Sequence, residues 1–258
     1  MKKQYTLAAL SVALLTMPAV GFAADAPDDK WHFGVTVPLW APGIDGDVTL
    51  RGKGSDVNID YDDLKENLDA AFGLGIEARK NKFGLFSSVG YMKFEGDEKK
   101  NGVKADWELK LLILDAGASY QLIRTEGERP FILEAYAGMR YWSTETDLKV
   151  KDNGTTIVNG DNSNDLIDPI VGLRGSQYLT PKLHLDFQGD IGGFGISDNQ
   201  SDFEWSASGM VSYDVVKWCT LSAGYRALAI DKSEGSGSHE NGLNIVMHGL
   251  ALAAKFKF

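Results

Sequence analysis

The sequence has very little cysteine, histidine and proline. Among its 258 residues are one cysteine, Cys219, four histidines and 7 prolines. A single thiol cannot form an internal disulfide, and one cysteine with scattered histidines does not make a zinc cluster. No glycine-rich stretch is followed by the Lys-Ser or Lys-Thr pair of a phosphate loop. We therefore expect no disulfide framework, no metal site and no cofactor.

After residue 23 the sequence has no long apolar run, and the chain has no excess of positive charge. The apolar run Leu7 to Val20 follows Lys2 and Lys3 and ends in small residues, which is the pattern of an export signal. We predict a signal peptide over residues 1–23 and a single domain over residues 24–258. Loss of the two lysines lowers the formal charge from −10 to about −12. A phosphate backbone needs a basic face, so nucleic acid is not an expected partner.

Alternation of apolar and polar residues is the strongest pattern that is present. In the last stretch the alternating apolar residues are Leu250, Leu252, Ala254, Phe256 and Phe258. A period of two with one apolar face predicts a strand. A terminal phenylalanine on such a strand resembles the closing strand of Gram-negative outer-membrane barrels. That resemblance implies that Phe256 and Phe258 act as a signal for the barrel assembly machinery.

About ten such segments follow one another, with eight or twelve as alternatives. Their connections alternate between short turns, as at Asn81, Thr180 and Lys217, and longer polar stretches, as at 95–104 and 151–165. Short turns at one end and long loops at the other are typical of outer-membrane barrels. We predict an all-β fold, a transmembrane antiparallel up-and-down β-barrel, with a short helix at residues 61–72 in the first long loop.

The polar faces of the predicted strands carry charges of both signs. If the apolar faces contact lipid, these charges form a network in the lumen: Glu77, Arg79, Asp115, Glu134, Arg140, Asp168, Arg174, Asp186, Asp190, Arg226 and Lys255. Charges in a narrow interior are costly unless paired. We expect Arg174 to lie close to Asp186, and Asp115 close to Arg140. Aromatic residues at strand ends predict an interfacial girdle: Trp31, Trp107, Tyr120, Phe131, Tyr141, Trp205, Tyr213 and Phe258.

No catalytic constellation stands out. A barrel of ten strands resembles omptin-type outer-membrane proteases, which need an Asp-His pair at the extracellular rim. His32 and His184 begin strands at the opposite end, and His239 lies in a loop. His248 has outward parity, but residue 250 is Leu, so the His-x-Ser pattern of lipid A deacylases is missing. We therefore expect no catalytic residues and no enzyme activity.

The chain as a whole resembles small uncharacterised outer-membrane barrels of proteobacteria. The residues that carry the resemblance are Trp31, Phe33, Pro38 and Trp40, then Gly224, Tyr225 and Arg226, and finally His248, Gly249 and Phe258. The resemblance implies a location in the outer membrane, with lipid, lipopolysaccharide and the assembly machinery as partners. We predict a non-enzymatic barrel that is structural or passes small solutes through a charged lumen. The alternatives are a rim hydrolase (a protease or a lipid A modifying enzyme) and a soluble periplasmic, lipocalin-like binding barrel.

Overall fold

The structure is a computed structural model that describes residues 29–50, 52–100, 103–152 and 155–258. The predicted signal peptide, residues 1–23, lies outside the described residues. Among the described residues, no helix is both long enough and apolar enough to span a membrane.

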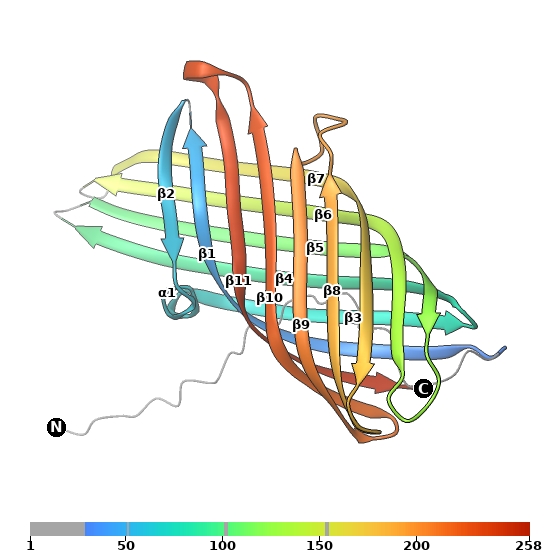
Figure 1. Cartoon of the computed structure of the whole chain (residues 1–258). Helices are drawn as coiled ribbons and strands as arrows, with labels where there is room; N and C mark the ends of the chain where they lie inside the picture. Colours follow the sequence, from blue (N-terminus) through green and yellow to red (C-terminus); the bar gives the residue numbers. More distant parts are fainter. Residues whose placement is uncertain (1–28, 51, 101–102, 153–154) are drawn as a thin grey trace, which may run out of the picture.

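Ten antiparallel strands close into a barrel (Figure 1). The strands are β1 (His32–Leu50), β3 (Leu68–Lys80), β4 (Phe83–Lys100), β5 (Val103–Arg124), β6 (Phe131–Asp152), β7 (Thr155–Tyr178), β8 (Leu183–Gly193), β9 (Phe203–Val216), β10 (Cys219–Glu234) and β11 (Asn241–Lys257). Each pairs with its neighbour in the chain, and β1 closes the ring against β11. The short strand β2 (Lys53–Ile59) pairs with the far half of β1. The prediction of a ten-stranded, up-and-down barrel is therefore confirmed.

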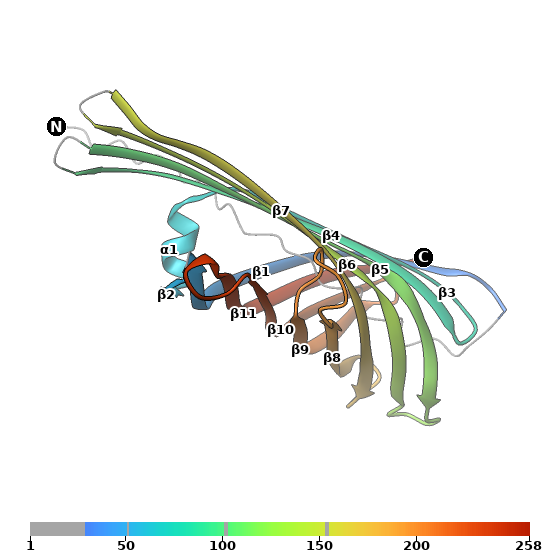
Figure 2. The same ribbon diagram turned by 90° about the horizontal axis from the view of Figure 1, so that it is seen from above.

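Strands β4–β7 project beyond the rest of the barrel. Strands β5, β6 and β7 have 22, 22 and 24 residues, about twice the 9–11 residues that a membrane-spanning strand needs. Figures 1 and 2 show β4–β7 projecting together to one side. The described residues of the stretches 95–104 and 151–165, which were predicted as loops, are strand. The prediction was wrong there because both faces of these hairpins are rich in polar residues, so the apolar alternation that marks a strand is lost.

The helix α1 (Tyr61–Glu66) is shorter than predicted, and Leu68 already begins β3. The spacing of four between Leu68 and Phe72 fits a helix, but it also fits a strand of period two. A register shift after Leu68 turns Phe72 to the outside. Leu64 is 8 % exposed and packs on the buried core, so α1 lies against the barrel mouth beside β1 and β2 (Figure 2).

The outer wall of the barrel is apolar. Leu252 is 48 % exposed and Leu185 41 %, whereas Arg140 is 0 % exposed and Asp190 5 %. The apolar faces therefore point outward and the charges inward, which is the arrangement of a barrel in lipid.

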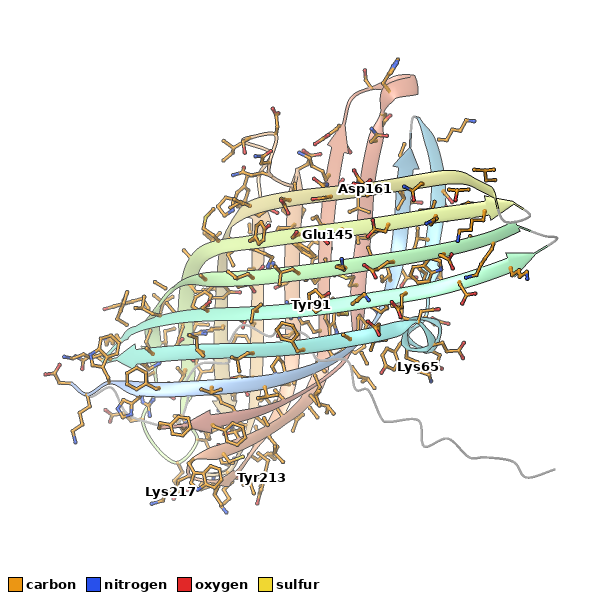
Figure 3. All side chains as sticks on the ribbon, turned by 180° about the vertical axis from the view of Figure 1, so that it is seen from behind. Lys65, Tyr91, Glu145, Asp161, Tyr213 and Lys217 are labelled. Atoms are coloured by element: carbon orange, nitrogen blue, oxygen red, sulfur yellow. The ribbon has the colours of Figure 1, made fainter. Side chains whose placement is uncertain are left out.

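Aromatic side chains form a belt at the end where β1 begins and β11 ends, which we call the lower end. Exposed members are Trp31, Phe33, Phe83, Tyr120, Tyr213, Trp218 and Phe258. Figure 3 shows Tyr213 there, beside Lys217. On β3 and β4, the rings of Phe72 and Tyr91 stack with centroids 5.5 Å apart. Trp107, predicted as a girdle residue, instead packs against the inner core, because its parity on β5 is inward.

The lumen has two levels. The lower level is polar. The upper level is mostly an apolar core with these buried members: Trp40, Leu64, Met92, Phe94, Ile113, Trp142, Leu166, Met210, Leu228, Ile230, Met247, Ala251 and Ala253. Met210 reaches down into the polar level, since it lies opposite Asp186. The expectation of a polar lumen therefore holds only for the lower level.

Candidate functional site: the charge network of the lumen

The upper centre of the network is Arg140 on β6. Its Nε donates to Oδ1 of Asp115 on β5 at 2.8 Å. Its Nη1 lies 3.1 Å from Oδ1 of Asp190 on β8 and 3.4 Å from Oε1 of Glu204 on β9. All four side chains are 0 % exposed. This one guanidinium therefore links β5 and β6 to β8 and β9, which lie beyond β7 in the barrel wall.

Neutral donors complete the upper centre. The indole Nε1 of Trp142 donates to Glu204 at 2.9 Å, and the hydroxyl of Tyr136 donates to Asp190 at 2.6 Å. Arg226 lies nearby with its Cζ 5.0 Å from the ring centroid of Trp40, a cation–π contact. The sequence prediction missed Tyr136 and Trp142 as partners, although both share the inward parity of Arg140 on β6.

The lower centre is Arg174 on β7. Its Nε donates to Glu134 at 2.9 Å, and its Nη2 donates to Glu77 at 2.6 Å. Arg79 pairs with the same two carboxylates, and Nζ of Lys255 lies 3.6 Å from Glu77. Three cations therefore share two carboxylates from β3 and β6, so this cluster also spans several strands.

Two of the predicted members have other partners. Asp168 accepts hydrogen bonds from the backbone N–H and the hydroxyl of Ser201, both at 2.8 Å. Asp186 pairs with Nδ1 of His184 at 2.9 Å. All eleven predicted residues are buried on the inner face.

Of the two predicted pairs, Asp115 with Arg140 is present. The expected match of Arg174 with Asp186 is displaced, since Arg174 lies opposite Gln188 while Asp186 lies opposite Ser176.

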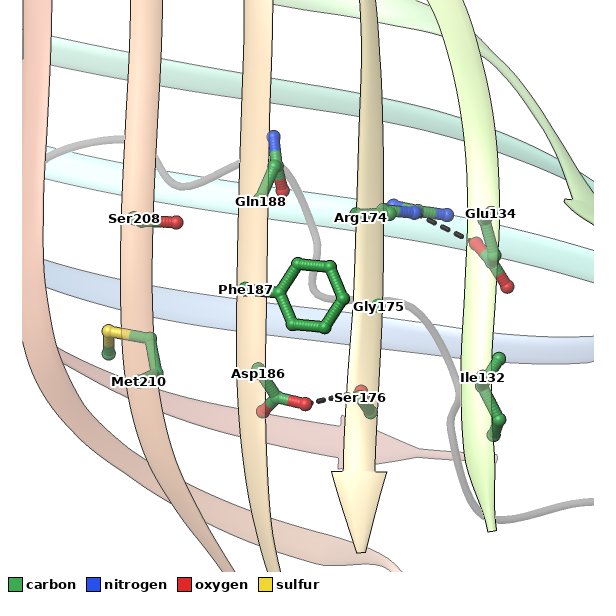
Figure 4. A pocket seen from close by; sticks show the side chains of 10 residues that line it. All are labelled: Ile132, Glu134, Arg174, Gly175, Ser176, Asp186, Phe187, Gln188, Ser208 and Met210. Atoms are coloured by element: carbon green, nitrogen blue, oxygen red, sulfur yellow. Dashed lines mark hydrogen bonds and ion pairs between the residues drawn. The ribbon is translucent and has the colours of Figure 1, made fainter. Parts of the chain in front are cut away.

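Little space is left between these side chains. A cavity of about 20 Å³ lies beside Arg174, Glu134 and Asp186 (Figure 4), which is room for about one water molecule. Within the described residues, no group of three or more His, Cys, Asp or Glu side chains is arranged to hold a metal ion. The arrangement can hold the barrel closed and can carry fixed charge.

Sequence comparison finds no matching family model and no matching curated protein. Structure comparison finds the outer-membrane protease OmpT of Escherichia coli, with a TM-score of 0.52 and 11 % identity over 89 % of this chain and 97 % of that one. The chain has the fold of a transmembrane β-barrel of the bacterial outer membrane. Also found are Neisserial surface protein A (TM-score 0.30, 15 % identity, 88 % and 97 % covered) and Ail of Yersinia pestis (TM-score 0.32, 11 % identity, 90 % and 99 % covered).

Proposed function

We propose that the protein is a closed, structural outer-membrane barrel whose lumen neither conducts solutes nor carries catalysis. The observation that carries this proposal is the pair of arginine centres, Arg140 and Arg174, each of which joins strands across the lumen. An ion-selective pore also uses charged rings, but it needs a continuous water path between them. Here the charges contact one another, and the apolar core packs against them.

The energetics of buried charge favour the same role. Removing one partner of a buried ion pair typically costs about 3–5 kcal/mol, because the remaining charge is left uncompensated. Arg140 is held by three carboxylates and Arg174 by two. Such a network stabilises one packed arrangement of the lumen, which suits a barrel that stays shut.

Recording from single barrels in planar bilayers tests the proposal. The intact protein should show no steady conductance, and R140A should show frequent opening because the link across the lumen is lost. R129A is the matched control, since Arg129 is exposed in the turn between β5 and β6. A steady conductance of the intact protein, at the level that R140A shows, would overturn the proposal.

Two alternatives, a soluble lipocalin-like barrel and a rim protease, receive less support. A soluble lipocalin-like barrel needs an apolar interior and a wet exterior, whereas Leu252 and Leu185 are exposed on the outer wall. A proteolytic site at the rim needs an Asp-His pair facing the lumen. Among the described residues, His184 pairs with Asp186 and Asp214 at the lower end, and Asp45 pairs with His248 on the outer wall.

The proposed partners are outer-membrane lipid, lipopolysaccharide and the barrel assembly machinery. The end of the last strand is where such machinery would bind. Phe256 stacks on Trp218, and Phe258 exchanges two backbone hydrogen bonds with Phe33 while its side chain stays 75 % exposed. Replacing Phe258 with Ala should therefore slow insertion into membranes more than it lowers the stability of the inserted barrel.

A further inference from the structure

A chain of hydrogen bonds crosses four strands on the outer wall, away from the lumen. The hydroxyl of Tyr225 on β10 lies 2.5 Å from Nδ1 of His248 on β11. Nε2 of the same imidazole lies 2.6 Å from Oδ2 of Asp45 on β1, and Asn58 on β2 donates to Oδ1 of Asp45 at 2.7 Å. These residues come together where β1 closes the barrel against β11.

The chain of bonds faces lipid near the upper edge of the apolar band. Tyr225 is 48 % exposed, and the side chains of His248 and Asp45 are 39 % and 44 % exposed. His248 precedes Phe258 in the lower belt by about 10 residues, which at about 3.3 Å per residue and a tilt near 40° is about 25 Å of height. That height matches the apolar band of an outer-membrane barrel. The site therefore lies at the upper boundary of the apolar band, at the height where the ester groups of the outer-leaflet lipids are found.

The protonation states follow from the partners. A carboxylate only accepts hydrogen bonds, so Nε2 of His248 carries the proton and donates to Asp45. Nδ1 is then the acceptor, and the phenol of Tyr225 donates to it. Nε2 is hydrogen-bonded to Asp45 and Nδ1 to the hydroxyl of Tyr225. The proton that this imidazole is placed to accept is therefore the phenol proton of Tyr225. Nucleophile, base and orienting carboxylate follow one another at hydrogen-bond distance, as an activated nucleophile requires.

The wall beside this site is open to a lipid chain. The outward residues level with His248 on the neighbouring strands are Gly43, Ala227 and, one strand further, Ala207. Among these positions only His248 has a large side chain. Leu250, the next outward residue below it, is 70 % exposed. An acyl chain can therefore approach the backbone closely and bring its ester to the phenol oxygen.

We propose that Tyr225, His248 and Asp45 form a nucleophilic site for carboxylic esters of outer-leaflet lipids. His248 takes the phenol proton while the Tyr225 oxygen attacks the ester carbonyl, and Asp45 stabilises the imidazolium. The bond to the alcohol then breaks, the alcohol leaves with the proton from His248, and the acyl group remains on Tyr225. A water molecule gives a proton to His248 and attacks the aryl ester. The fatty acid leaves, and the phenol regains its proton.

This site is independent of the closed lumen, so the two proposals can fail separately. The test uses the full-length barrel in phospholipid vesicles that contain a lipid with a fluorogenic acyl ester, and it measures fatty acid release. A fluorophosphonate probe followed by mass spectrometry locates any covalent adduct. We expect release by the intact protein and an adduct on Tyr225. Y225F and H248Q should each lower the rate at least about 100-fold, the usual contribution of such groups.

Y213F is the matched control, because Tyr213 is also an outward tyrosine that is 48 % exposed. It should retain the full rate. D45N should show an intermediate loss with a changed pH profile, which a purely structural role would not produce. Folding of each variant is checked by the gel mobility of the unheated barrel. No release and no adduct from the folded intact protein, or equal rates for intact protein and Y225F, would overturn the proposal.

Discussion

Arg140 on β6 lies directly opposite Asp115 on β5, with 2.8 Å between Nε and Oδ1 and neither side chain exposed. The pair joins two neighbouring strands, while the other contacts of Arg140 pass over β7 through the lumen to β8 and β9. Asp115 therefore binds Arg140 from the neighbouring strand, while Asp190 and Glu204 bind it from more distant strands.

Replacing Asp115 with Asn should destabilise the barrel by about 3 kcal/mol, because a buried cation loses one of its compensating charges. Equilibrium unfolding in lipid vesicles measures the change. D147N is the control, since Asp147 is exposed on the part of β6 that projects from the barrel. An equal effect of both substitutions would show that the buried pair contributes no more than surface charge.

Replacing Arg174 with Lys tests geometry at constant charge. The guanidinium reaches Glu134 through Nε and Glu77 through Nη2, and one ammonium group cannot reproduce that fork. We expect a loss of about 1–3 kcal/mol in the same unfolding assay, with R129K unchanged. Full stability of R174K would mean that charge alone suffices.

The outer face of the projecting strands should loosen in acid. Lys93 bonds Asp69, Glu95 and Glu108, and the pKa of Glu108 is held below its usual range by its hydrogen bonds to Lys110 and Lys93. A lowered carboxyl pKa stabilises the fold above the ordinary value, near 4.5, and the contribution is lost as the pH falls through the folded pKa. Amide exchange over 93–110, corrected for intrinsic rates, should show less protection at pH 3 than at pH 7. Equal protection at both values would contradict this.

The β1–β2 hairpin should respond in the opposite sense. Asp47 and Asp56 face each other across the two strands, and the hydrogen bond to Asp56 raises the pKa of Asp47. A raised carboxyl pKa gives stability that is present at low pH and lost as the pH rises. D56N should therefore increase amide protection of the hairpin at pH 7 and change little at pH 3. Reduced protection at pH 7 would show that the pair is not repulsive.

Truncating Leu64 tests whether α1 closes the mouth. This side chain is buried on the apolar core, and a buried Leu-to-Ala change typically costs about 2–5 kcal/mol. Limited proteolysis should cut residues 60–67 faster in L64A than in the intact chain. The exposed neighbour Lys65 gives the control variant K65A, for which we expect no change in cleavage.

Strand parity made much of the fold and of the lumen predictable. Alternation alone assigned Arg140 and Asp115 to the same face, and a turn of the right length placed them opposite each other. The match of Arg174 with Asp186 was displaced because Tyr178 pairs with His184, which centres the turn on Pro181 and shifts the register by two residues. A turn's register depends on its backbone conformation, which residue patterns specify poorly.

Contacts across the closing seam were beyond prediction for a different reason. Asp45 and His248 are 203 residues apart, and they meet only because β1 and β11 pair in one particular register. Likewise the inward parity of Trp107 was visible, but its packing against the apolar core depends on contacts between strands that are far apart in the sequence. Tertiary placement, not local pattern, decides both.

Strands β5 and β6 run without a break from the lumen into the part that projects from the barrel. This continuity limits how the lengths of these strands can change. Because side chains alternate with a strict period of two, inserting one residue above Asp115 would exchange the inner and outer sides of everything beyond it. Lys110 and Glu108 would then turn inward, while Trp107 and Leu109 would face solvent. In homologous barrels with longer or shorter projections, each projecting strand should therefore differ in length by an even number of residues. The strand paired with it should change by the same number.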